Sequence, residues 1–206
     1  QALQYNTSKH NYFVVTRSGT THTIYLNGSG TSSSKVGSSA NISSTAMAIG
    51  SWFDGRSSQI YTGEISQVSL YSKALTTAEI DQNYYKGSIV TDDLVGAFDP
   101  SNLVSYEPGT TTTFSLTGSA GAAGDGTLNN GVAYSDSGGG AWVLDGVDDY
   151  ISFGNPSSMS NAQVTVTFWY NPTTLMNSTH NGVLNGKTPG GKFCLFWING
   201  TTLSTQ

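Results

Sequence analysis

Few side chains of this sequence could carry out acid–base catalysis. The ionisable candidates are three glutamates and three histidines, far apart along the chain: Glu64, Glu79, Glu107, His10, His22 and His180. Hydrolysis of a glycosidic bond needs two carboxyl groups at a fixed separation, one as general acid and the other as nucleophile or base. Glu79 has another role, because it stands three residues after Thr76 and predicts a helix capping box. We therefore predict no catalytic residues and expect the histidines in exposed loops or strands.

Three aspartates cluster in one short segment, Asp145, Asp148 and Asp149. Calcium takes several oxygen ligands from carboxylates and loop carbonyls, so this segment could hold a calcium ion. The alternative is that Asp145 and Gly146 simply form a turn while the other two carboxylates are solvated. The sequence leaves both open, and we assign no metal ligand and no cofactor.

Carbohydrate binding is the other chemistry that the side chains suggest. Trp52, Arg56 and Tyr61 lie in a stretch between two predicted strands, and such loops often carry binding residues. An exposed aromatic ring can cover the apolar face of a sugar, and Arg can donate to its hydroxyl groups. The alternative is that Trp52 and Tyr61 fill the interior. The other three tryptophans (Trp142, Trp169 and Trp197) stand in predicted strands, and we expect them in the core.

The composition excludes several classes of protein. Only 10% of the 206 residues are charged and the net charge is −5, so the chain has no basic footprint for nucleic acid or anionic membranes. No apolar stretch is long enough to insert into a membrane. A single cysteine, Cys194, excludes an internal disulfide and a zinc site made of cysteines, and its apolar neighbours predict a buried thiol. Abundant Gly, Ser, Thr and Asn suit a secreted or particle-surface protein.

The pattern of the chain is almost entirely β. Runs such as 12–16, 23–26, 163–170 and 192–198 are rich in β-branched and aromatic residues, and turn signals such as Asn27-Gly28 separate them. In 63–71, Val68 and Leu70 share a face with Ile65 only if a bulge intervenes or both faces are buried. The strands expected at 141–144 and 150–153 flank Asp145–Asp149 as a hairpin-like turn. One helix is expected, over about 77–86.

Two sets of motifs resemble the concanavalin A-like (laminin G-like) jelly roll. Tyr25-Leu26-Asn27-Gly28, Gly63 to Thr76 and the helix that follows resemble its C-terminal half. Leu94 to Asn102 with Ser105-Tyr106, Gly126 to Gly131 and Leu144 to Ile151 resemble its N-terminal half. The resemblance implies an all-β jelly-roll sandwich. Ser66 stands where the family often has Asp, so no ion is inferred there, and the alternating Glu-x-Asp-x-Glu strand of glycosidases on this fold is absent.

The two halves come in reversed order. Residues 1–88 resemble the C-terminal half, 89–91 form a linker, and 92–206 resemble the N-terminal half, so together they amount to about one domain. Three explanations stay open: a permuted single domain whose ends lie close together, a repeat cut out of phase from an array, and halves exchanged between neighbouring subunits. Because the sequence starts without Met or a signal peptide, we favour an array or assembly.

The resemblance implies a binding or structural module rather than an enzyme. The stretch from Leu94 to Tyr106 is most similar to modules of phage virion proteins. We therefore expect a structural or adhesive module of a virion fibre or extracellular filament, with a capacity for glycan binding; the alternative is a carbohydrate-binding module of a secreted enzyme or adhesin. The expected partners are copies of itself, adjacent repeats and a cell-surface glycan, and the expected location is extracellular or on a virion.

Overall fold

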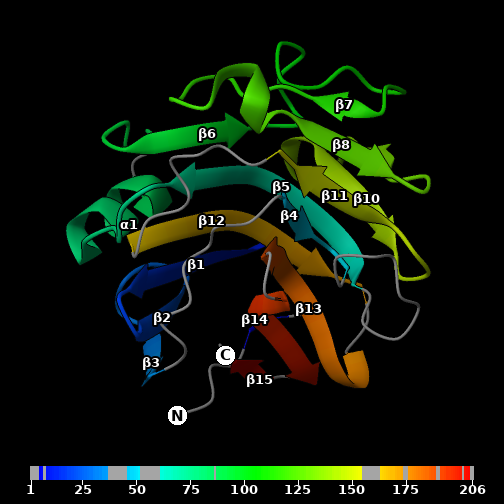
Figure 1. The fold of residues 1–206 in the computed structure, drawn as a ribbon. Coiled ribbons are helices and arrows are strands. Elements are labelled where there is room, and N and C mark those ends of the chain that lie inside the picture. The colour runs from blue at the N-terminus through cyan, green and yellow to red at the C-terminus, as the bar shows by residue number, and fades with distance from the viewer. Residues whose placement is uncertain are drawn as a thin grey trace.

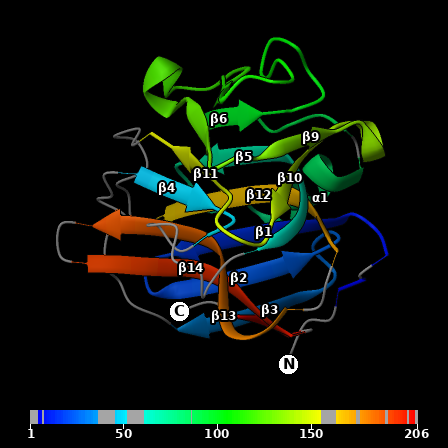
Figure 2. The same cartoon turned by 90° about the vertical axis from the view of Figure 1, so that its right-hand side faces the viewer.

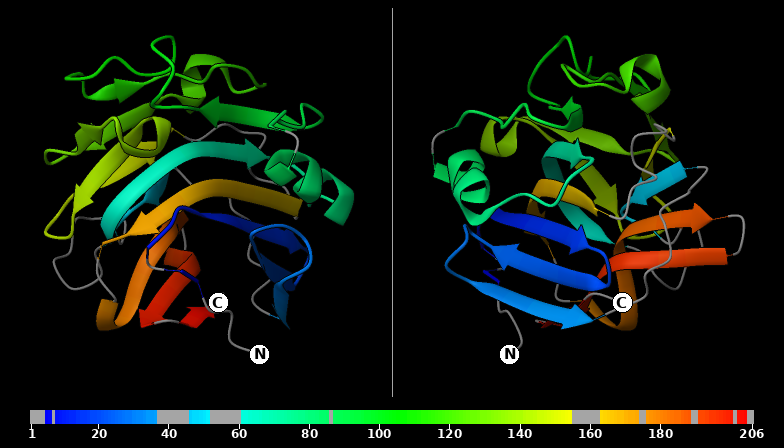
Figure 3. Two further views of the ribbon diagram at one scale, coloured as in Figure 1. Left: turned by 180° about the vertical axis from the view of Figure 1, so that it is seen from behind. Right: turned by 60° about the vertical axis from the view of Figure 1, so that its left-hand side comes forward.

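The computed structural model describes residues 5–6, 8–36, 46–51, 61–85, 87–154, 163–173, 176–188, 191–200 and 202–204. These residues form two antiparallel sheets and one α-helix (Figure 1). Figures 2 and 3 show the two sheets as separate layers, with the dark-blue strands of residues 11–26 in one and the orange-red strands of residues 176–200 in the other. The predicted all-β sandwich is therefore confirmed.

Each sheet has a simple strand order. The first sheet, sheet A, runs in the order β3 (Ser32–Val36), β2 (Thr21–Leu26), β1 (Asn11–Ser18), β12 (Gln163–Pro172), β5 (Thr62–Tyr71), β10 (Ala141–Asp145) and β9 (Ala133–Ser135), and β6 (Leu94–Phe98) also pairs with β5. The second, sheet B, runs in the order β15 (Thr202–Ser204), β14 (Gly191–Gly200), β13 (Met176–Thr188), β4 (Ala46–Ile49), β11 (Tyr150–Phe153), β8 (Gly126–Asn129) and β7 (Thr112–Thr113). Two short 3₁₀ turns, η1 (Gly121–Gly124) and η2 (Ser137–Gly139), interrupt the loops.

Both sheets draw strands from both parts of the sequence. Strand β12, from the second part, pairs with β1 on one side and with β5 on the other. In sheet B, β4 pairs with β11 and β13 in the same way. Within this chain the two sets of motifs thus build one sandwich. Whether neighbouring copies also contribute strands depends on association, so the three explanations for the reversed order stay predictions.

The core lies between the sheets and is rich in aromatic rings. On β12, alternate residues point inward, and Phe168 stacks on Phe13 of β1 with ring centroids 5.7 Å apart. Tyr170 meets Phe13 edge-on, and Trp142 is fully buried as predicted. Each such ring removes a large apolar area from water, which is the main stabilising contribution of this layer.

The outer face of sheet A is covered in part by the helix α1 (Thr77–Tyr85) and the residues after it (Figure 1). Ile80 of α1 packs on Tyr71, Tyr12 and Val14 of the sheet. The predicted capping box is confirmed, because Glu79 N–H donates to Thr76 Oγ1 (3.3 Å) and Glu79 Oε2 accepts from the Thr76 N–H (2.9 Å). In the part of the chain that the structure describes, no helix has the length and hydropathy of a membrane span.

Strand β5 changes phase at Gln67. Ile65, Val68 and Leu70 all face the core, although a regular strand would place Val68 on the opposite side from Ile65. Gln67 has a φ of 49°, and the register with β12 shifts at the same level. Of the two alternatives that the sequence left open, a bulge or burial of both faces, the structure shows the bulge.

Two sequence predictions were wrong. The segment Asp145–Asp149 does not close a hairpin, because β10 lies in sheet A and β11 in sheet B, so the turn crosses between the layers. His22 is buried (3% exposed) on β2 rather than exposed. The side chains of Trp197, His180 and Cys194 lie outside the described residues.

The stacked pair of phenylalanines gives a test of the core. Phe168→Ala should lower the free energy of unfolding by about 3–5 kcal/mol, because it removes a fully buried ring and leaves a cavity. Val104 is 74% exposed, so Val104→Ala should change it by no more than about 0.5 kcal/mol. Chemical denaturation followed by tryptophan fluorescence measures both. A loss below about 1 kcal/mol for Phe168→Ala would contradict this account of the core.

Candidate ligand-binding site

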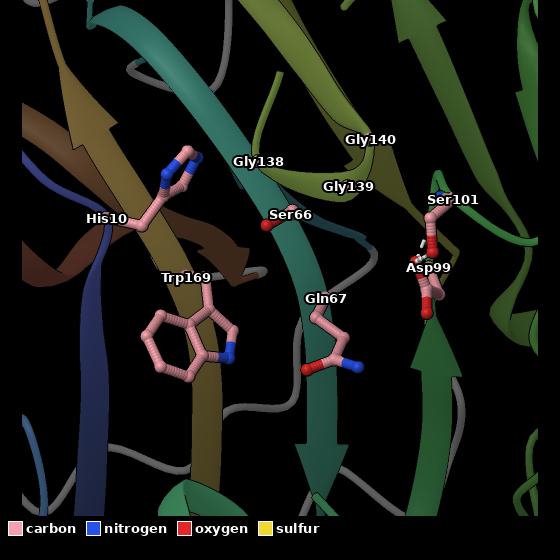
Figure 4. Close-up of a pocket in the computed structure, with 9 residues that line it drawn as sticks. All are labelled: His10, Ser66, Gln67, Asp99, Ser101, Gly138, Gly139, Gly140 and Trp169. Atoms are coloured by element: carbon pink, nitrogen blue, oxygen red, sulfur yellow. Dashed lines mark hydrogen bonds between the residues drawn. The ribbon is translucent and has the colours of Figure 1, made fainter. Parts of the chain in front are cut away.

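A cavity of about 370 Å³ opens on the outer face of sheet A, beside α1. Its volume is within the range typical of small-molecule sites. The lining comes from five separate parts of the chain: His10, Ser66, Gln67, Asp99, Ser101, Gly138, Gly139, Gly140 and Trp169 (Figure 4). We call it the outer-face pocket.

The bulge in β5 shapes the middle of this pocket. Neighbouring residues of a regular strand point to opposite faces, but the bulge lets Ser66 and Gln67 both line the pocket. The amide of Gln67 is exposed and makes no hydrogen bond within the described residues. Figure 4 shows this amide lying across from Trp169. The pocket thus offers a free donor and acceptor at its centre.

Trp169 supplies the aromatic wall. The alternation of β12 turns its neighbours Phe168 and Tyr170 into the core and Trp169 outward. Tyr12 lies against the indole with a centroid separation of 5.1 Å, and Tyr84 stacks on it at 5.7 Å. These contacts fix the ring, and part of it still lines the pocket. The prediction of Trp169 as a core residue is corrected, since it is half-buried on the opposite side of the sheet.

His10 forms another part of the pocket wall, and Glu64 lies beside it. His10 Nε2 lies 3.4 Å from Glu64 Oε2, and Asn171 Nδ2 donates to the same oxygen at 3.0 Å. Both side chains are mostly buried, with 23% of His10 and 13% of Glu64 exposed. Glu64 thus accepts a hydrogen bond from Asn171, whereas His10 Nε2 has no hydrogen-bond partner within the described residues.

The glycine turn at 138–140 approaches these side chains closely. A Cβ on Gly138 would lie 2.5 Å from His10 Cε1, and one on Gly140 would lie 2.8 Å from Ser101 Cα. Both residues also have positive φ values, 62° and 118°. Only glycine fits these requirements without displacing a pocket wall. On the far side, Asp99 Oδ1 accepts from the Ser101 N–H and hydroxyl, at 2.9 and 2.6 Å.

Of the residues predicted to bind carbohydrate, Tyr61 does not line this pocket. Tyr61 is fully buried, with its ring 4.6 Å from that of Tyr170. Burial and the neighbouring Tyr170 raise the pKa of Tyr61 well above its usual range. Tyr61 thus fills the interior, as in the alternative reading, and offers no surface to a ligand. Trp52 and Arg56 lie outside the described residues.

The pocket residues could be found in part from the sequence. The alternation of 163–170 places Trp169 on the face opposite Phe168 and Tyr170, and the expected bulge points to Ser66 and Gln67. Nothing local indicates that His10 and the turn at 138–140 meet on this face, because that contact depends on tertiary structure.

The aspartate segment forms a second polar cluster. One carboxylate oxygen each from Asp145, Asp148 and Asp149 lies within 4.8 Å of the others. Asp149 is only 2% exposed, and its Oδ2 accepts from the Asp145 N–H at 3.0 Å while Oδ1 has no hydrogen-bond partner. Burial, and then the two neighbouring carboxylates, raise the pKa of Asp149. These oxygens are of the kind that calcium binds, and calcium at this turn stays a prediction.

The buried carboxylate makes stability depend on pH. Because the folded-state pKa of Asp149 is raised, its charged form destabilises the fold, and stability falls as pH rises from the unfolded pKa through the folded one. Asp149→Asn should therefore raise the melting temperature at pH 7 in EDTA, and the gain should vanish at pH 3. Asp92→Asn, at an exposed position, is the matched control. A variant less stable than the parent at pH 7 would refute this account.

Comparison with known proteins gives one match. Residues 2–81 match the family model Laminin_G_3, described as the Concanavalin A-like lectin/glucanases superfamily. No curated protein and no solved structure gives a significant match. The matched residues are the segment predicted as the C-terminal half, and the resemblance of 92–206 stays a prediction. Residues 2–81 therefore resemble the concanavalin A-like, laminin G-like superfamily, and the two antiparallel sheets form the all-β sandwich that this resemblance implies.

Proposed function

We propose that this chain is a non-catalytic adhesive module that binds glycans in the outer-face pocket. The observation that carries the proposal is the fixed, half-buried indole of Trp169 beside the free amide of Gln67. The match to a superfamily whose name includes lectins supports it.

The pocket has the groups that a sugar needs. The C–H face of a pyranose can stack on the indole, while its hydroxyl groups donate to and accept from Gln67 and the free oxygen of Asp99. Rigid aromatic walls with a few placed polar groups are typical of specific small-ligand sites. Trp169 is already held by Tyr12 and Tyr84, so binding orders little that is mobile.

The carboxylates of the pocket support a binding role over hydrolysis. Glu64 is engaged by His10 and Asn171, and Asp99 by Ser101. Neither is placed as a free acid opposite a free base across the pocket. Incubation with labelled polysaccharides should release no new reducing ends, and turnover that Glu64→Gln abolishes would refute the non-catalytic proposal.

We further propose that the module works in a virion fibre or an extracellular filament, with copies of itself or adjacent repeats as partners. The support is the similarity of 94–106 to modules of phage virion proteins and the low charge of the chain. The second candidate is a carbohydrate-binding module of a secreted enzyme or adhesin, which the pocket favours equally. Whether copies of the chain associate in solution distinguishes the filament role from the carbohydrate-binding module.

Replacement of Gln67 tests whether the glycan binds in the outer-face pocket. Gln67→Ala should weaken binding of a glycan identified on an array about fivefold, because one hydrogen bond of about 1 kcal/mol is lost. Gln163→Ala is the matched control, since Gln163 is exposed on the same strand as Trp169 and about 20 Å away. Isothermal titration calorimetry measures both affinities. Equal affinities for the two variants would place the ligand elsewhere.

Native mass tests the filament role. We expect light scattering on native material to give a multiple of the 21.6 kDa chain mass, because the proposed partners are copies of the chain. A denatured intact mass measured beside it separates association from a longer polypeptide. A native mass equal to one chain would contradict the filament role and leave the carbohydrate-binding module.

A further inference from the structure

The charged residues around the outer-face pocket affect which sugars can bind there. Among the described residues that line it, none is Lys or Arg, and Asp99 contributes a carboxylate. Glu64 is not among the lining residues, and its Oε2 lies 3.4 Å from His10 Nε2. Lys9 is exposed in the loop before β1 but is not one of the lining residues. An anionic ligand would meet the Asp99 carboxylate, with no Lys or Arg side chain in the described lining.

A row of aromatic rings leads away from the pocket along the outer face of sheet A. Trp169 lines the pocket, Tyr84 of α1 stacks on Trp169 at 5.7 Å, and Tyr85 meets Tyr84 edge-on at 4.5 Å. Tyr85 is 71% exposed, although it is a large aromatic residue on a helix that otherwise covers the sheet. The three rings are thus in contact one after another, from the cavity to the exposed Tyr85.

The exposed tyrosine has little structural role within the described residues. Ile80 anchors α1 to the sheet, and Asp81 fixes it to the β2–β3 turn by accepting from the Ser29 N–H and hydroxyl, both at 2.7 Å. Tyr84 is held between Tyr12 and Trp169. Tyr85 therefore adds exposed aromatic area that packing of the helix does not require.

We propose that the ligand is a neutral oligosaccharide that occupies the pocket with one residue and continues over Tyr84 and Tyr85. The inference rests on the proposed glycan binding and specifies the ligand of the same site. The Asp99 carboxylate disfavours sulfated and carboxylated saccharides by like-charge repulsion.

Chain length and charge of the ligand test the inference separately from the proposed function. The probes are neutral ladders of one to six residues of glucose, mannose, galactose or N-acetylglucosamine, and the sulfated forms of the best binder, measured by calorimetry. Affinity should rise from the monosaccharide to the tri- or tetrasaccharide and then level off. Sulfation should weaken binding about tenfold or more at low salt.

Tyr85→Ala should weaken binding of the tetrasaccharide about three- to tenfold and leave the monosaccharide unchanged. Phe114→Ala is the control, because Phe114 is also an exposed aromatic residue (49%) but is not among those that line the pocket. Equal losses for both ligand lengths, or none, would overturn the extended path. Equal or tighter binding of the sulfated form would overturn the neutral class. If no ladder binds at all, the glycan-binding function itself fails.

Discussion

The pairing of β12 between β1 and β5 is the constraint on which the rest of the structure depends. Its inward residues join the aromatic core, and its outward residues organise the opposite face. Thr165 shows this second role, because its hydroxyl accepts from the Leu75 N–H at 2.9 Å and donates to the Lys73 carbonyl at 2.8 Å. One side chain thus satisfies the backbone that leads into α1. Further along the same face, Trp169 receives Tyr84 from that helix. The strand therefore positions the helix and the pocket together.

The pocket exists because the register between β5 and β12 is interrupted. In a regular strand that kept Ile65 in the core, Gln67 would also point inward. Val68 and Leu70 would then point outward and leave the core. Burial of these two aliphatic side chains stabilises the bulged register by several kcal/mol in apolar area alone. The positive φ of Gln67 costs about 1 kcal/mol, which that burial outweighs. Burial of these core residues therefore determines the geometry of the pocket.

Local sequence signals predicted the features of the fold that depend on interactions between neighbouring residues. The capping box at Thr76 and Glu79, the turn at Asn27-Gly28 and the need for a bulge in 63–71 were all predictable, because each depends on neighbouring residues. The same signals failed at Asp145–Asp149, where a turn of ordinary composition crosses between two sheets. They failed also for Tyr61, since aromatic residues in loops look alike whether they plug a sandwich or face water. The meeting of His10 with the glycine turn involves residues more than a hundred positions apart, and no local pattern reports it.

Because the chain has few charges, the proposed site would recognise its ligand mainly through uncharged contacts. Recognition through one indole and a few neutral donors and acceptors gains little from long-range attraction, so encounter is slow and each contact is worth about 1 kcal/mol. A single pocket of this size then binds a neutral sugar weakly. Linked copies change this outcome, because after the first site has bound, the second meets its ligand at a high effective concentration. Weak neutral sites are therefore useful on a fibre or filament that presents many of them. In this proposal, self-association and glycan binding are two parts of one adhesive mechanism.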